Sequence, residues 1–181
     1  GAALLQDGEE TWVVAEMPGT LHQAVANGDV VEMRRLMAAG VNVDEVDANG
    51  WTALFYAAML GHVEAIRVLV ELGANMESKD ANGQTPLHFA AQKGHVEVIK
   101  LLVELGADKE AKAVDGLTPL HKAAGNGHVE AIKMLVQLGA NKDAKTANGA
   151  TPLHFAAQKG HVEAIKALVQ LGADKEAMNA Y

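Results

Sequence analysis

The sequence predicts an all-α solenoid of five stacked helix-turn-helix repeats with tight, hairpin-like loops between them. Glycines recur in three series that share one interval of 33 residues, and the stretches between them carry the apolar patterns of two short helices. A unit of this length has no interior of its own, so it must bury its apolar side chains against neighbouring copies. The three series are Gly50, Gly83, Gly116 and Gly149, then Gly61, Gly94, Gly127 and Gly160, and finally Gly73, Gly106, Gly139 and Gly172.

The copies cover nearly the whole chain. Their boundaries lie at about 14–46, 47–79, 80–112, 113–145 and 146–178, and the first copy is the least regular. We therefore predict a repeat domain over 18–181, preceded by a leader over 1–17 that can pack on the first repeats.

The first helix of each unit begins at a threonine that is followed by proline. In the copy at 80–112, the Thr85 hydroxyl can accept from a free backbone amide at the start of the helix. Pro86 takes the first helical position, where its missing N–H costs nothing. We expect Gly94 to end the helix, because glycine adopts the left-handed conformation most readily.

The second helix of the unit begins at His95 and ends before Gly106. Glu97 in its first turn suits the positive end of the helix dipole. Apolar residues lie on most sides of this helix, which predicts burial on most sides by the neighbouring units. The Asn82-Gly83 pair is typical of a tight turn between units.

The tetrapeptide Thr-Pro-Leu-His occurs at 85–88, 118–121 and 151–154, with Ala-Ala, Gly-His and Gly-Ala pairs at fixed offsets after it. These motifs resemble those of the ankyrin repeat family, whose repeats have the same period. The resemblance covers residues 18–178. It implies a stack of helix pairs that presents a surface to other proteins, and it points to no particular partner, because ankyrin arrays serve many cellular roles.

Composition narrows the functional classes. The 181 residues carry a formal net charge of −8, which argues against nucleic-acid binding because that function depends on basic patches. No apolar run approaches the roughly 20 residues that span a membrane. The absence of cysteine and of a signal-peptide pattern predicts an intracellular, cytoplasmic protein.

The eight histidines occupy two positions of the repeat. A catalytic site would not be copied in register, and the resemblance assigns these positions to turn and inter-repeat hydrogen bonds. No phosphate-binding loop, catalytic triad or pair of catalytic carboxylates stands out, so we predict no enzyme activity, no cofactor and no metal site. The two sets are His22, His88, His121 and His154, and His62, His95, His128 and His161.

Acidic residues recur at one position of the repeat and form a ladder along one edge, because stacked helices lie about 8–10 Å apart. One interpretation is a solvated edge that neighbouring lysines partly neutralise. The other is a weak binding strip for a basic partner. The residues are Asp44, Glu77, Glu110, Asp143 and Glu176.

Function is expected where the copies differ, because the shared positions hold the array together. In proteins that resemble this one, two of the variable positions face the concave side. The copy at 47–79 carries aromatic and methionine residues, which are typical of binding hot spots. We therefore predict a protein-binding surface whose candidate residues are Trp51, Tyr56, Met59, Leu60, Gln84, Gln92, Lys93, Leu117 and Asn126.

A second interpretation places Trp51 and Phe55 beneath the leader, whose apolar residues need cover. In that case Trp51 serves stability and not binding. The leader residues concerned are Leu4, Leu5, Trp12 and Val13.

The last copy keeps the apolar pattern of an internal repeat, although terminal repeats need polar outer faces. We favour a longer array or end-to-end contact with another molecule over a tolerated apolar end. The predicted function is a protein–protein interaction module, a scaffold or adaptor with a rigid concave surface. The alternatives are a targeting or regulatory segment of a larger enzyme or channel, and a self-associating structural spacer.

Overall fold

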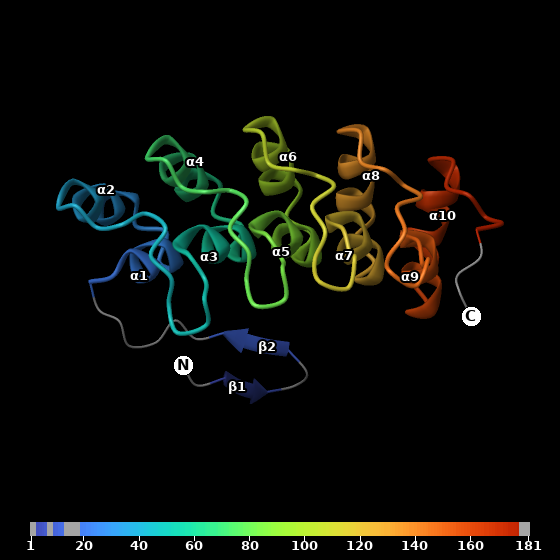
Figure 1. The fold of residues 1–181 in the computed structure, drawn as a ribbon, viewed down its shortest axis with the longest axis horizontal. Helices are drawn as coiled ribbons and strands as arrows, with labels where there is room; N and C mark the ends of the chain where they lie inside the picture. The colour runs from blue at the N-terminus through green and yellow to red at the C-terminus, as the bar shows by residue number, and fades with distance from the viewer. Residues whose placement is uncertain (1–2, 7–8, 13–18, 178–181) are drawn as a thin grey trace.

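Each predicted unit contains two helices in the computed structural model of the chain (Figure 1). The structure describes residues 3–6 and 9–12 as strands and residues 19–177 in full. The helices recur at the predicted interval. They are Leu21–Ala26 (α1), Val30–Ala38 (α2), Ala53–Leu60 (α3), Val63–Glu71 (α4), Pro86–Lys93 (α5), Val96–Glu104 (α6), Pro119–Gly125 (α7), Val129–Gln137 (α8), Pro152–Gln158 (α9) and Val162–Gln170 (α10).

A two-stranded antiparallel hairpin precedes the helices. Strand β1 (Ala3–Gln6) pairs with β2 (Glu9–Trp12). The repeat pattern does not predict this hairpin, because its strands are short and lie outside the repeat. The predicted packing of Leu4, Leu5, Trp12 and Val13 over Trp51 concerns side chains that lie outside the described residues.

The helices form two rows (Figure 1). Helices α1, α3, α5, α7 and α9 make the first row, α2, α4, α6, α8 and α10 make the second, and each helix contacts its equivalent in the next unit. The stack extends along a line and has no common centre. The predicted all-α solenoid is therefore confirmed.

Four turn loops project from the stack on the side of the first row (Figure 1). They cover 47–51, 80–84, 113–117 and 146–150, and a backbone hydrogen bond of 2.9–3.0 Å closes each one. Neighbouring loops are also joined by backbone hydrogen bonds. For example, the Val114 N–H donates to the Asn82 carbonyl at 2.9 Å. We call the surface formed by the turn loops and the first-row helices the inner face.

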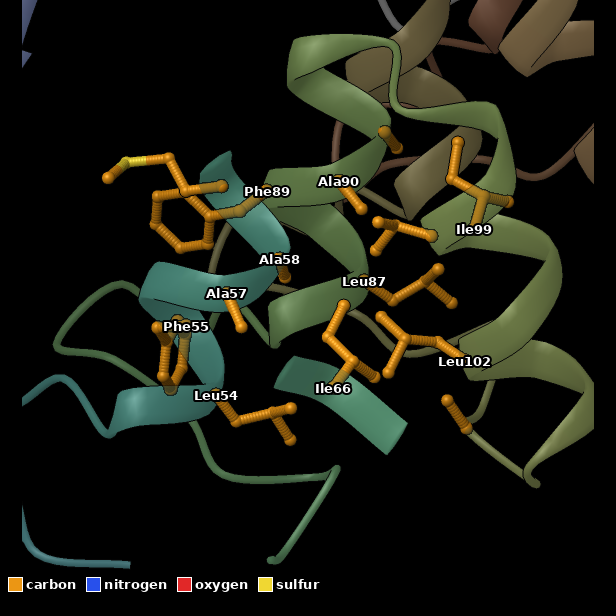
Figure 2. Packing of buried hydrophobic residues seen from close by; sticks show 14 of the residues in the cluster. Leu54, Phe55, Ala57, Ala58, Ile66, Leu87, Phe89, Ala90, Ile99 and Leu102 are labelled. Atoms are coloured by element: carbon orange, nitrogen blue, oxygen red, sulfur yellow. The ribbon is translucent and has the colours of Figure 1, made fainter. Parts of the chain in front are cut away.

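Apolar side chains of both rows meet in one continuous core. Figure 2 shows Leu87 from α5 close to Ile66 of α4 and Leu102 of α6, so a single side chain bridges two units. All three are at most 1 % exposed. Burying an aliphatic side chain of this size contributes roughly 1.5–3 kcal/mol. The stability of each unit therefore depends on its neighbours.

A glycine with a positive φ lies at or just after the end of the first helix in each unit. Gly127 has a φ of +73°, in the left-handed region. A Cβ at this position would lie 2.7 Å from Nδ1 of His161. Gly160 holds the same position in the last unit with a φ of +74°, but no heavy atom would lie within 4 Å of its Cβ. Gly127 is therefore needed both for its positive φ and for the close approach of His161, whereas Gly160 is needed only for its positive φ.

This difference gives a matched pair of substitutions. Gly160→Ala should lower the free energy of unfolding by about 1 kcal/mol, from backbone strain alone. Gly127→Ala should lower it by a further ~1–2 kcal/mol, because the added methyl group meets the His161 ring. Urea denaturation followed by circular dichroism measures both values. Equal losses in the two variants would contradict the inter-unit contact.

Candidate functional site

Histidines of the first row join each unit to the next. His88 is fully buried, and its Nδ1 accepts from the Thr85 N–H at 3.0 Å. The proton of the neutral ring therefore lies on Nε2, which donates to the Leu117 carbonyl of the next unit at 2.9 Å. Equivalent bonds run from His22 to the Trp51 carbonyl and from His121 to the Ala150 carbonyl.

Histidines of the second set bond in the opposite direction. Nε2 of each lies 2.8–3.3 Å from a carbonyl at the end of the first helix in the preceding unit. Seven of the eight histidines thus hydrogen-bond across an interface between units, which confirms their structural role. Among the described residues, no group of histidine, aspartate and glutamate has the arrangement of a metal site. The pairs are His62 with Ala26, His95 with Met59, His128 with Gln92, and His161 with Gly125.

The acidic ladder also belongs to these interfaces. Glu77 accepts from the backbone N–H of Asp108 in the next unit at 2.8 Å, and Glu110 accepts from that of Asn141 at 2.7 Å. Asp44 and Asp143 bond in the same way. Neither sequence interpretation foresaw this role, because the sequence does not show which loop amide faces each carboxylate.

Aromatic residues of the unit at 47–79 form a buried cluster. Trp51 is 7 % exposed, and its ring centroid lies 4.9 Å from that of Phe89 in the next unit and 6.1 Å from that of Phe55. Figure 2 shows Phe55 and Phe89 close together, on the side of α3 and α5 away from the second row. Tyr56 is 4 % exposed, and its hydroxyl donates to the Asp47 carboxylate. Burial raises the pKa of Tyr56 most, and this hydrogen bond raises it further.

The prediction that Trp51, Tyr56 and Met59 lie on an exposed face is therefore wrong. Met59 is only 6 % exposed. The physical reason is that Phe89 reaches across from the next unit and offers the Trp51 ring an aromatic partner, and such pairs are favourable beyond the area that they bury. The aromatic residues are buried and pack between successive units, so they stabilise the stack.

The other candidate residues divide by exposure. Leu60 is 41 % exposed, whereas Gln84 is 9 % exposed and lies against Asp80. Gln92 and Leu117 are half-buried. Lys93 and Asn126 are exposed. Of the nine predicted residues, only Gln84 and Leu117 line the hollows described next.

Two hollows flank the turn loop at 113–117 on the inner face. The Phe155 hollow has a volume of about 620 Å³, with Leu117, Ala150 and Phe155 as its apolar lining. Its polar residues are Asp115, Thr146, Asn148, His154 and Gln158. The Lys122 hollow has a volume of about 360 Å³ and is lined by Asn82, Gln84, Ala113, Val114, Asp115 and Lys122.

Sequence reasoning did not select Val114, Asp115, Lys122 or Phe155. A signal was present, because residues 114–116 read Val-Asp-Gly where the neighbouring loops have Ala-Asn-Gly, and Lys122 occupies the position of Phe89 and Phe155. Without coordinates, this signal does not show that the altered residues surround two hollows.

Lys122 on α7 is a half-buried cation. Burial lowers its pKa, and the negative charges of Asp115 and Asp80 only partly offset that effect. No carboxylate among the described residues forms an ion pair with it. Its ammonium group is therefore partly desolvated and has no direct ion pair, although the two carboxylates lie near enough to stabilise its charge.

Thr52 carries a buried hydroxyl group with no partner among the described residues. The equivalent Thr85 hydroxyl lies 2.9 Å from Nδ1 of His88, but Phe55 replaces that histidine in the unit at 47–79. Thr52→Val should therefore raise the free energy of unfolding by about 1 kcal/mol. Thr85→Val, the matched control, should lower it by ~1–2 kcal/mol. Urea midpoints measure both, and a loss in Thr52→Val would show that the hydroxyl has a partner.

Comparison with known proteins agrees with this geometry. A family model described as ankyrin repeats (3 copies) matches residues 21–113 and 106–179. The search of curated proteins found no match. No described helix has the length and apolar character needed to cross a membrane. Ankyrin repeats generally act as protein–protein interaction modules. Since the two matched segments take in all ten described helices, the chain belongs to the ankyrin repeat family.

Proposed function

We propose that the chain is a protein-binding module whose partner docks on the inner face, centred on the unit at 113–145. The observation that carries this proposal is the pair of hollows on either side of the turn loop at 113–117. Interfaces in proteins are built around concave sites that accept a few large side chains. The predicted surface is thereby moved from the aromatic unit at 47–79 toward Leu117.

Rigidity of the inner face supports this proposal. Hydrogen bonds from first-row histidines, second-row histidines and ladder carboxylates hold successive units together. Turn loops are bonded to each other as well. A face that is already ordered loses little conformational entropy when a partner binds.

Chemical variation also supports it. Val114 is 81 % exposed at the tip of its loop, where the neighbouring loops have the smaller Ala81 and Ala147. An exposed apolar residue beside two hollows is a feature of a contact surface more than of a solvated turn.

Substitution of Val114 tests the proposal. Wild-type protein, Val114→Asp and Val31→Asp are used as baits, because Val31 on α2 is also 81 % exposed but lies in the second row. A partner held by the inner face should bind the wild type and Val31→Asp, and its recovery in quantitative mass spectrometry should fall about tenfold with Val114→Asp. Equal recovery with all three baits would contradict the proposed face.

The alternative is that the chain is a targeting or regulatory segment of a larger enzyme or channel. Such a segment would bind its partner through the same inner face. The intracellular, cytoplasmic location is inferred from composition, and the net charge of −8 argues against a nucleic-acid partner. The domain limits at 18–181 are likewise inferred.

Self-association is a second candidate function, through the outer face of the last helix pair. His154 and Glu176 hold the positions that bond to the next unit elsewhere in the stack, and neither bonds to a following unit among the described residues. Ala157 is exposed there, although its equivalents in the three preceding units are 0 % exposed. We infer that this face can take up a second copy of the chain. Sedimentation velocity over a wide concentration range tests the inference, with Ala157→Glu as the blocking variant. A strict monomer would contradict it.

A further inference from the structure

We propose that the inner face binds an extended acidic peptide segment of its partner, with a carboxylate at Lys122 and a bulky apolar side chain in the Phe155 hollow. This inference rests on the proposed function and names the partner chemistry of the same face. It follows from the different character of the two hollows and from the distance between them.

The Lys122 hollow requires a negative group. Lys122 is half-buried and has no direct ion pair among the described residues, although the charges of Asp80 and Asp115 act on it. Asp115, on the same hollow, is exposed to solvent. A desolvated charge gains more from a counter-ion than a hydrated one does. The hollow therefore selects a carboxylate in preference to a basic side chain, although Asp115 lies on its edge.

A peptide suits this hollow better than a small anion. Gln84 is 9 % exposed, and its Oε1 has no donor among the described residues. Rotation about the terminal amide torsion, which is soft, can turn this side chain toward the hollow. An extended peptide then supplies a backbone N–H for Gln84 and a carboxylate for Lys122.

The Phe155 hollow requires an apolar group. Leu117, Ala150 and Phe155 form an apolar wall beside its five polar residues, and the Phe155 ring is held edge-on by His121, with ring centroids 5.4 Å apart. The apolar lining is therefore positioned before binding. Its volume of about 620 Å³ accommodates a large aliphatic or aromatic side chain.

The distance between the two hollows sets the separation of the carboxylate and the apolar side chain along the peptide. The hollows belong to successive units, which stack about 8–10 Å apart. An extended chain covers ~3.3–3.6 Å per residue, so the carboxylate and the apolar side chain should be about three residues apart.

Selection from a phage-displayed library of random dodecapeptides tests the proposal. We expect enrichment of aspartate or glutamate about three positions from a large apolar residue. The selected peptides are then synthesised with a fluorescent label, and their affinity is measured by fluorescence anisotropy.

Lys122→Phe is the decisive variant, because phenylalanine is the residue at this position in the units at 80–112 and 146–178. It should fold with a urea midpoint at or above that of the wild type, and weaken binding about tenfold. Lys100→Met, which removes an exposed lysine from α6 in the second row, should leave the affinity within about twofold. Glutamine in place of the peptide's acidic residue should weaken binding to the wild type but have no further effect with Lys122→Phe.

Three results would overturn the inference. They are enrichment of basic peptides whose binding is lost in Asp115→Asn, selected peptides that bind Lys122→Phe as tightly as the wild type, and no enrichment at all. Each leaves the proposed function to be judged separately, by the loss of the protein partner with Val114→Asp.

Discussion

Acidification from pH 7 to pH 4 is expected to lower the free energy of unfolding by an amount on the order of 5 kcal/mol. Burial lowers the pKa of His88 and of His121 from 6.5 to about 4, even though hydrogen bonds to the Leu117 and Ala150 carbonyls oppose this shift. Each ring must also be neutral for its Nδ1 to accept from a threonine N–H.

The sign follows from proton uptake. Below about pH 6.5 the unfolded chain binds a proton at each of these histidines and the folded chain does not, so stability falls as the pH drops. The loss develops between pH 6.5 and about pH 4, and each ring contributes roughly 2–3 kcal/mol.

Urea denaturation at several pH values measures the effect, with the double variant His88→Gln and His121→Gln as control. The slope of stability against pH in this window should be much smaller in the control. Ring-proton NMR gives an independent check, because the two imidazoles should titrate only well below pH 6. Titration of either ring near pH 6.5 in the folded protein would contradict the prediction.

Trp51→Ala should lower the free energy of unfolding by ~3–5 kcal/mol, which is the usual loss for a large aromatic side chain removed from a core. The ring contacts Phe55, Tyr56 and Phe89, so its removal leaves a cavity between two units. Partner binding at Val114 should be unchanged under conditions where the variant stays folded.

Trp51→Leu is the matched control, because Leu117 stands at the same position in the unit at 113–145. It should cost roughly half as much as Trp51→Ala, since the cavity is partly refilled. Denaturation curves for the two variants, together with anisotropy of the selected peptides, check both statements. Loss of binding in a stable Trp51 variant would restore the aromatic surface that the sequence suggested.

Much of the fold could be predicted because its signals are local. Thr85 and Pro86 mark the start of a helix, and Gly94 marks its end with a φ of +74°. The copying of these signals at one interval also indicates stacking, because a single unit cannot bury its own apolar residues. The hairpin of β1 and β2 lies outside the repeat and lacked that support.

Less of the candidate site could be predicted, because exposure is not a local property. Trp51 and Val114 both differ from the residues at the same positions of the neighbouring turn loops, yet one is 7 % exposed and the other 81 %. What separates them is the residue that approaches from the next unit. Phe89 covers Trp51, and no side chain covers Val114 to the same extent.

The order of helices, turns and caps is therefore encoded within each stretch of 33 residues, where neighbouring side chains and backbone torsions act on one another directly. The functions of the histidines, the acidic ladder and the aromatic residues depend on partners 29–38 residues away, which come into contact only when the units stack. Stacking also creates the two hollows, because their walls come from different units. Burial between units thus gives Trp51 a role in stability and leaves Lys122 half-buried without a direct ion pair. The local sequence pattern predicts neither outcome.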